Sequence, residues 1–337
     1  MDRAGAWVDG IAGTATGVGS LPGTDPLEAA RLVLGELPDL AHLPELPARG
    51  AGADMVGRTA SALVDLHVDL QPAGWRFVPR PGRDERRATW MLAQDLDALE
   101  EAAQGYDGPL KVQLVGPWTL AASVELPRGD KALSDPGASR DIASSLAETV
   151  AAHVRDVRRR VPGARVVVQL DEPLLPAVLA GRVRTASGYD VIAAVEDSRA
   201  ESALAGVIDA AQVPVVVHCC AAGVPVSLLR RAGAGGVSLD ASVLGQRDDE
   251  ALGEALEAGV VLLAGVVPSL DTTLSDPAAT VDPVRRMWRR LGLDPASLSR
   301  LVVVTPTCGL AGASPRHARA ALQAARAAAR VLAEDPE

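Results

Sequence analysis

The feature that most constrains this chain is a regular alternation of short, β-branched apolar runs with longer segments of helical period. The eight runs with strand composition are, in order, Thr16–Leu21, Leu40–Leu46, Lys111–Val115, Arg165–Leu170, Val213–Cys219, Gly236–Asp240, Val260–Val267 and Leu301–Thr305. Strands that alternate with helices pair in parallel and form an α/β fold. Eight such units predict a closed (β/α)8 barrel, the TIM barrel.

The intervening segments predict the helices of this barrel. They cover Pro26–Leu37, Ala53–Leu70, Leu96–Gln104, Ser139–Val161, Ser198–Ala211, Val226–Ala232, Asp249–Ala258 and Val281–Leu291, and a last helix is expected over Pro315–Glu334. Several of the strands are apolar on nearly every residue, as expected when helices cover the outside of a barrel. No stretch of linker composition interrupts the alternation, so we expect residues 1–337 to form a single TIM-barrel domain.

Composition argues against several classes of protein. The net charge is -10 with acidic and basic residues interspersed, and aromatic residues make up 2% of the chain, so a nucleic-acid partner is not expected. The longest apolar stretch, Ala258 to Pro268, is far shorter than the roughly 20 residues of a membrane helix. Three cysteines form no disulfide framework, and the first residues show no secretory leader. We therefore expect a cytoplasmic protein without a membrane partner.

Polar residues stand at most of the predicted strand ends. A TIM barrel carries its catalytic groups there, on the loops that lead from strand to helix. The first two strands are followed by Ser20 and Glu45, the fourth by Asp171 and Glu172, the fifth by His218 and Cys220, the sixth by Asp240 and the eighth by Cys308. The seventh strand ends in an apolar stretch, Val266–Pro268. The sequence thus predicts an active site at this rim.

Four of these residues, His218, Cys220, Asp240 and Cys308, have the side chains that zinc takes as ligands. His218 and Cys220 are two residues apart and share a strand face, whereas Cys219 points to the other face and is expected in the core. Their dispersed spacing is weak evidence alone, since a buried cysteine is often only a small apolar residue. Their common position at strand ends favours zinc. A zinc-bound thiol is deprotonated and nucleophilic at neutral pH, so the site predicts alkyl transfer to a thiol.

Two further segments have both a functional and a structural interpretation. The Asp171-Glu172 pair is either a solvated loop before Pro173 or a pair of carboxylates that faces a cationic substrate. The Gly17-Val18-Gly19-Ser20 segment either offers backbone N–H groups to a carboxylate or forms only a tight turn. No dinucleotide-binding fingerprint follows it.

These residues resemble the motifs of the cobalamin-independent methionine synthase family, specifically its C-terminal catalytic barrel. GVGSLPGT is similar to the family's Ile-Gly-Ser-Phe-Pro motif, VGPWTLAAS to its Gly-Pro-Val-Thr segment and VQLDEPLL to its Ile-Asp-Glu-Pro-Ala segment. VVHCC matches its His-x-Cys motif, and TPTCGL matches its Pro-Asp-Cys-Gly-Leu turn. The matches follow the family's order over nearly the whole chain.

The resemblance implies that His218, Cys220 and Cys308 ligate zinc, and Asp240 stands near the place of the family's fourth ligand, a Glu. It also implies that Ser20 and Asp171 hold the amino-acid end of homocysteine, with Glu172 in support. The expected activity is therefore zinc-dependent methyl transfer to the thiol of homocysteine, which makes methionine. The methyl donor is expected to be methyltetrahydrofolate or a methylated corrinoid protein.

The chain departs from the family in the half that handles the methyl donor. Ala264–Pro268 stands in place of an Asp-Ile-His-Ser-Pro motif and has no His for proton transfer. Arg49 falls near the family's loop Glu, for which Glu45 is the expected substitute, and Ser123 replaces an aromatic residue that helps to bind folate. The N-terminal barrel of the two-barrel enzymes is absent from this sequence. Two alternatives stay open: a non-catalytic or differently specific thiol-binding barrel, and a metal-free barrel of the uroporphyrinogen decarboxylase type.

Overall fold

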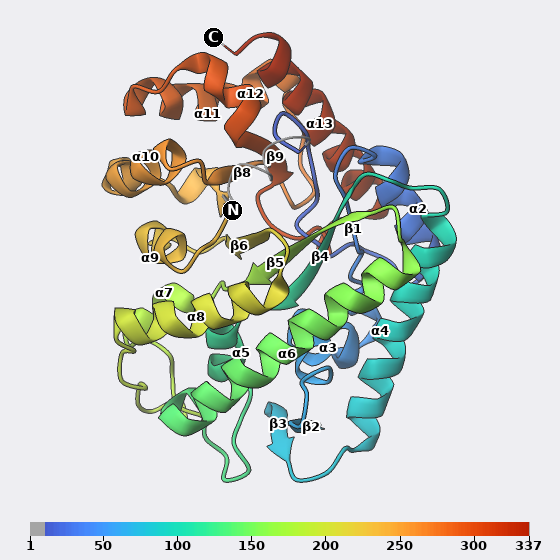
Figure 1. The fold of residues 1–337 in the computed structure, drawn as a ribbon, viewed down its shortest axis with the longest axis vertical. Helices are drawn as coiled ribbons and strands as arrows, with labels where there is room; N and C mark the ends of the chain where they lie inside the picture. Colours follow the sequence, from blue (N-terminus) through green and yellow to red (C-terminus); the bar gives the residue numbers. More distant parts are fainter. Residues whose placement is uncertain (1–10, 337) are drawn as a thin grey trace.

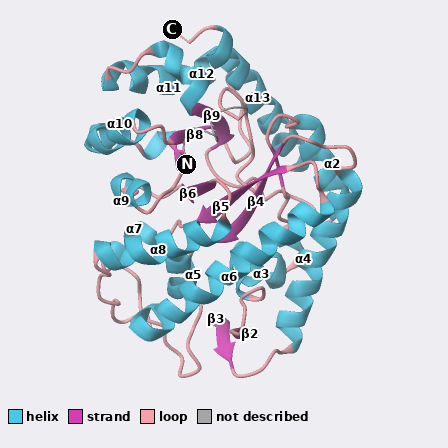
Figure 2. Cartoon of the chain, viewed as in Figure 1, coloured by secondary structure: helices cyan, strands magenta, loops and turns pink. Residues whose placement is uncertain are grey.

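Seven parallel strands follow one another around a curved sheet in the order β1-β4-β5-β6-β7-β8-β9. The structure is a computed structural model that describes residues 11–336. The strands are β1 (Ala41–His42), β4 (Pro109–Val115), β5 (Arg165–Asp171), β6 (Val215–Cys219), β7 (Gly236–Asp240), β8 (Val261–Val267) and β9 (Val302–Pro306). Helices surround this sheet (Figures 1 and 2). The fold is the α/β TIM-barrel class that the sequence predicts.

The place between β9 and β1 is taken by an irregular segment, not by the regular strand predicted over Thr16–Leu21. Its path still closes the barrel, because Ala15 forms a parallel bridge with Val304 of β9 and Ser20 forms one with Glu45, just beyond β1. The backbone N–H of Leu21 donates to the Glu45 carbonyl over 2.8 Å. Between these two bridges the Val18 carbonyl turns into the barrel, where it accepts hydrogen bonds from side chains instead of a neighbouring strand. The prediction of a regular strand is therefore wrong.

Long helices cover the outside of the barrel. They are α2 (Pro26–Glu36), α4 (Arg83–Ala102), α6 (Pro136–Arg160), α8 (Asp197–Ala211), α10 (Asp249–Glu257), α11 (Pro277–Leu291) and α13 (Pro315–Glu334). Shorter ones are α3 (Met55–Ala60), α5 (Pro117–Ser123), α7 (Leu175–Leu179), α9 (Val226–Arg231) and α12 (Leu298–Leu301). Asp25, Asp135 and Asp276 start α2, α6 and α11 in the same way, with a carboxylate that accepts first-turn N–H groups and a proline at the next position. Both features favour helix initiation. No helix in the described part of the chain combines the length and the hydropathy of a membrane span.

The helix predicted over Ala53–Leu70 is wrong after its first turns. Only α3 is helical there, and β2 (His67–Gln71) and β3 (Gly74–Val78) form an antiparallel hairpin outside the barrel sheet. Asp65 has a positive φ of 59°, which is incompatible with continuing a right-handed helix. In the hairpin, Val68, Trp75 and Phe77 are buried while their neighbours along the strands are more exposed. This alternation is the strand period that the helical interpretation overlooked.

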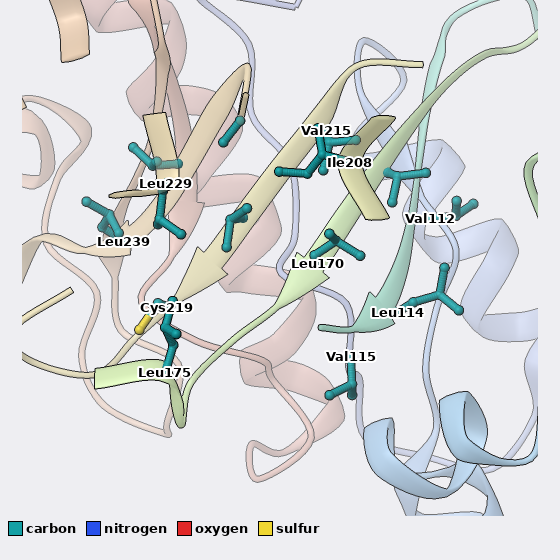
Figure 3. Packing of buried hydrophobic residues seen from close by; sticks show 14 of the residues in the cluster. Val112, Leu114, Val115, Leu170, Leu175, Ile208, Val215, Cys219, Leu229 and Leu239 are labelled. Carbon is teal, nitrogen blue, oxygen red and sulfur yellow. The ribbon is translucent and has the colours of Figure 1, made fainter. Parts of the chain in front are cut away.

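The two faces of the strands carry different residues. Outward-facing side chains, among them Val112, Leu114 and Leu239, pack in a large apolar cluster with the helices (Figure 3). A second cluster consists of Ile11, Leu40, Val167, Val216, Val261, Leu263 and Val303. Most of these lie on the inward faces of the strands, toward their N-terminal ends. Farther along the same faces stand polar residues such as Gln169 and His218. The barrel interior is thus apolar toward the N-terminal ends of the strands and polar toward their C-terminal ends, where the site lies.

Candidate active site

His218, Cys220 and Cys308 come together at the carboxyl ends of the strands. His218 is near the end of β6, Cys220 follows that strand, and Cys308 lies in the turn after β9. One ligand atom from each residue lies within 4.8 Å of the others, and the two Sγ atoms are 3.5 Å apart. His218 is buried and both cysteines are half-buried. One imidazole and two thiols at this spacing fit a zinc ion.

Ser238 of β7 orients the imidazole of His218. The two residues are partners in the β6–β7 register, and the Ser238 Oγ lies 2.9 Å from the Nδ1 of His218. Because Nδ1 is engaged, Nε2 is the ring nitrogen left for a metal, as in many metal-binding histidines. Ser238 was not among the site residues predicted from the sequence. The signal was present, since Ser238 stands two residues before Asp240 on the same strand face.

The two cysteines differ in acidity because they contact each other. The hydrogen bond with Cys220, followed by one with His218, lowers the pKa of the Cys308 thiol. The same contact and burial raise the pKa of the Cys220 thiol. One thiol of the pair therefore loses its proton readily. Metals bind the thiolate form, so this acidity supports the fit of the site to zinc.

Among the described residues, Asp240 and Cys219 do not belong to the group formed by His218, Cys220 and Cys308. Asp240 ends β7, and its Oδ1 accepts a hydrogen bond of 2.8 Å from the N–H of Ser242. This bond caps the short 3-10 helix Ala241–Val243. Within residues 11–336, the ligand group contains no Asp240 oxygen. Cys219 faces the core beside Leu175 (Figure 3), and burial raises its pKa to about 12.

Asp171 reaches the same rim from β5. It is the partner of His218 in the β5–β6 register and is 7% exposed. The Nε2 of Gln169 donates a hydrogen bond of 2.7 Å to its Oδ1. Burial raises the pKa of the Asp171 carboxyl, and the nearby His218 opposes this shift. Asp171 is thus a buried carboxyl next to the ligand group.

Glu172 points the other way, toward the start of α5. Its Oε1 accepts from the N–H of Trp118 over 2.9 Å, and its Oε2 accepts from the N–H and Oγ1 of Thr119 over 2.8 and 2.7 Å. Gly116 makes room, because a Cβ there would lie 2.3 Å from this carboxylate. Burial raises the pKa of Glu172 to about 7, against the three hydrogen bonds. In this structure the carboxylate anchors α5.

Ser20 and Glu45 lie side by side at the rim. They form a parallel bridge, and a Cβ at Gly309 would lie only 2.1 Å from the Ser20 Oγ. The glycine therefore lets the Cys308 turn pack directly on Ser20. Glu45 is buried, and this burial is the main cause that raises its pKa to about 7. Arg58, whose Nε lies 3.9 Å from the Glu45 Oε1, lowers this pKa, and Asp171 raises it.

Comparison with known proteins identifies the family. The sequence profile of the cobalamin-independent synthase catalytic domain matches residues 12–331. The chain belongs to this family. The match supports an enzyme that is similar to the homocysteine methyltransferases. No curated protein matches the chain.

Solved structures show the same fold. The cobalamin-independent (B12-independent) methionine synthase from Shewanella sp. W3-18-1, in complex with selenomethionine, aligns with a TM-score of 0.65 at 13% identity. The alignment covers 96% of this chain and 98% of that one. A methyltransferase from Methanosarcina mazei aligns with a TM-score of 0.58 at 18% identity and covers 94% of both chains.

The positions that depart from the cobalamin-independent synthase family are engaged with other parts of the chain. Arg49 forms a buried ion pair with Asp95 of α4, which also pairs with Arg58. The carbonyl of Ser123 accepts a hydrogen bond of 3.2 Å from the Nζ of Lys131. At the end of β8, where the family has a His, the Pro268 carbonyl lies 3.1 Å from the Nε2 of His317 in α13. The carboxylate of Asp95 therefore balances the charge of Arg49.

Lys111 is a charged residue of the barrel interior that the sequence analysis did not single out. It is fully buried on β4, and its Nζ donates a hydrogen bond of 2.9 Å to the Val18 carbonyl. Burial lowers the pKa of Lys111 to about 7, while Asp171 and Glu45 act in the opposite direction. The Lys111 amine therefore interacts electrostatically with both carboxyls of the rim.

Proposed function

We propose that this enzyme is a zinc-dependent methyltransferase that acts on the thiol of homocysteine and makes methionine. The observation that carries the proposal is the group of His218, Cys220 and Cys308, whose ligand atoms lie within 4.8 Å of one another. These residues would hold zinc, and Asp240 is the proposed fourth ligand. Zinc, when bound, would keep the thiol of homocysteine deprotonated at neutral pH.

Ser20, Glu45 and Asp171 are proposed to bind the amino-acid end of homocysteine. Their position supports this role, since Ser20 packs on the Cys308 turn and Asp171 stands opposite His218 in the register. Glu45 and Asp171 are both buried, and Asp171 raises the pKa of Glu45. An α-ammonium group bound beside them would offset this repulsion and favour both charged carboxylates. Glu172 is proposed to act in catalysis by holding α5 in place next to the site.

The proposed methyl donor is methyltetrahydrofolate or a methylated corrinoid protein. The altered positions Arg49, Ser123 and Ala264–Pro268 are the reason to test both. We also propose that residues 1–337 form one domain and that the protein is cytoplasmic. The family match over residues 12–331 supports the first, and three unpaired cysteines, as expected in a reducing compartment, support the second.

Metal analysis of three cysteine variants tests the proposal. We expect about one zinc ion per purified chain, the stoichiometry of a single catalytic zinc site. Cys220→Ser and Cys308→Ser should lose this zinc. Cys219→Ser is the matched control, because Cys219 faces the core and should not affect the metal. Wild-type zinc that survives Cys308→Ser would contradict the proposed site.

Turnover then distinguishes the alternatives. The zinc-loaded protein is given homocysteine with each donor in turn, and methionine is measured. Methionine formed with either donor supports the proposal. Zinc and homocysteine binding without turnover would favour a non-catalytic thiol-binding barrel, in keeping with the missing His at Ala264–Pro268. A protein that takes up no zinc would contradict the proposed zinc-dependent activity.

A further inference from the structure

One buried amide group touches both sides of the proposed amino-acid site. Gln169 lies on the inward face of β5, two residues before Asp171, and is 1% exposed. Its Nε2 donates to the Asp171 Oδ1 over 2.7 Å and to the Val18 carbonyl over 2.9 Å. An amide nitrogen carries two hydrogens, so these two bonds use its full donor capacity.

The Val18 carbonyl is held from a second direction by Lys111. The Lys111 Nζ donates to it over 2.9 Å, so this oxygen accepts two buried hydrogen bonds and both of its lone pairs are used. The glycines on either side fit closely. A Cβ at Gly17 would lie 2.2 Å from the Nε2 of His42, and a Cβ at Gly19 would lie 2.4 Å from the Nε2 of Gln113. The segment that leads to Ser20 is thus fixed by side chains of the barrel interior.

We propose that Gln169 is a positioning residue that sets the separation of Ser20 and Asp171, while Lys111 secures the same carbonyl. Gln169 holds Asp171 directly and holds Ser20 through the backbone two residues earlier. Its effect on acceptor binding rests on the proposed function, in which Ser20 and Asp171 contact the amino acid. Without the amide, Asp171 loses a donor that fixes its carboxylate, and Val18 keeps only its bond to Lys111. The consequence should be weaker binding of the acceptor.

Gln169→Met tests this role, because methionine has a similar length and no N–H donor. Thr149→Val is the matched control for the loss of a buried hydrogen bond. Thr149 lies on α6, is 3% exposed, and its Oγ1 donates to the Ser145 carbonyl over 2.8 Å. Loss of a buried hydrogen bond to a charged group predicts a rise of about tenfold in the Kd and KM for homocysteine in Gln169→Met. Zinc content and kcat should stay near the wild-type values. Thr149→Val should change Kd by less than about threefold.

Hydrogen exchange of the backbone tests the same role without any substrate. The N–H groups of Thr16 and Leu21 are bonded across the barrel closure in the native protein. Peptides over residues 16–22 should exchange faster in Gln169→Met than in wild type or Thr149→Val. Unchanged exchange, or an unchanged Kd in a protein that binds homocysteine, would overturn the inference. A wild-type protein that binds no homocysteine would refute the proposed function, and exchange alone would then decide whether Gln169 holds the segment.

Discussion

The Nδ1 atom of His218 lies 2.9 Å from the Oγ atom of Ser238, its partner on the adjacent strand. The contact joins β6 to β7 at the level of the proposed metal ligands. If Nδ1 carries the ring proton and Ser238 accepts it, the lone pair of Nε2 is available to a metal. The hydroxyl thus fixes the ring orientation and, when it accepts a hydrogen bond from Nδ1–H, leaves Nε2 for zinc.

Ser238→Ala is expected to weaken zinc binding by about 10–100-fold, the usual effect of removing such a supporting contact. Competition with a chromophoric chelator measures the affinity. Ser238→Thr, which keeps the hydroxyl, serves as the control and should stay near the wild-type value. Equal affinities for the alanine and threonine variants would show that the hydroxyl does not prepare His218 for the metal.

Asp240→Ser should lower zinc affinity without unfolding the turn that follows β7. The Asp240 carboxylate now caps Ala241–Val243 through the Ser242 N–H, and serine can make the same cap but cannot replace a carboxylate ligand. Asp240→Ala removes the cap as well and should also cost about 1 kcal/mol of stability. Chelator competition and chemical denaturation separate the two effects. Unaltered zinc affinity in Asp240→Ser would leave Asp240 with the capping role alone.

Much of the barrel could be predicted because the evidence for β4 to β9 is local. Each of these strands is a short apolar run between helical segments, and buried parallel strands have this composition. The path of residues 16–21 was less predictable. It depends on Lys111 and Gln169, which are distant in sequence and take up the Val18 carbonyl that a regular strand would pair. The hairpin over residues 67–78 was missed because its first strand was taken for the end of a helix and no element was predicted for its second strand.

The candidate site, like the fold, could be predicted only in part. The convergence of His218, Cys220 and Cys308 followed from barrel geometry, since strand ends meet at one rim. The direction of the Glu172 carboxylate did not, because neighbouring residues on a loop can face opposite ways. Its contacts with Trp118 and Thr119 depend on how α5 sits against β5. Gln169 and Ser238 were overlooked, although each stands two residues before a predicted site residue on the same strand face.

Glu172→Gln should destabilise the protein by about 2–3 kcal/mol, because a buried carboxylate that accepts three hydrogen bonds is replaced by an amide that accepts fewer. Chemical denaturation measures this change, and zinc content should be retained. Thr119→Val removes one of the three bonds and should cost about 1 kcal/mol. A Glu172→Gln protein of unchanged stability that has lost methyl transfer would assign Glu172 to the chemistry itself.

Lys111→Met should change how stability depends on pH. Burial lowers the pKa of Lys111 from its ordinary value of 10.5 to about 7. Between these values the unfolded chain holds a proton that the native protein has released, so this residue makes the free energy of unfolding rise with pH. One proton contributes at most about 1.4 kcal/mol per pH unit.

Denaturation between pH 7 and 10 should therefore show wild type gaining stability relative to Lys111→Met as the pH increases. Below pH 7 both states bind the proton, and the difference between the two proteins should become constant. Gln113→Met is the control, because Gln113 is buried on the same strand and has no titratable group. Its free energy of unfolding should differ from that of wild type by the same amount at every pH. The stability difference between wild type and Lys111→Met could instead be as independent of pH as the difference for Gln113→Met. Lys111 would then titrate near its ordinary pKa despite its burial.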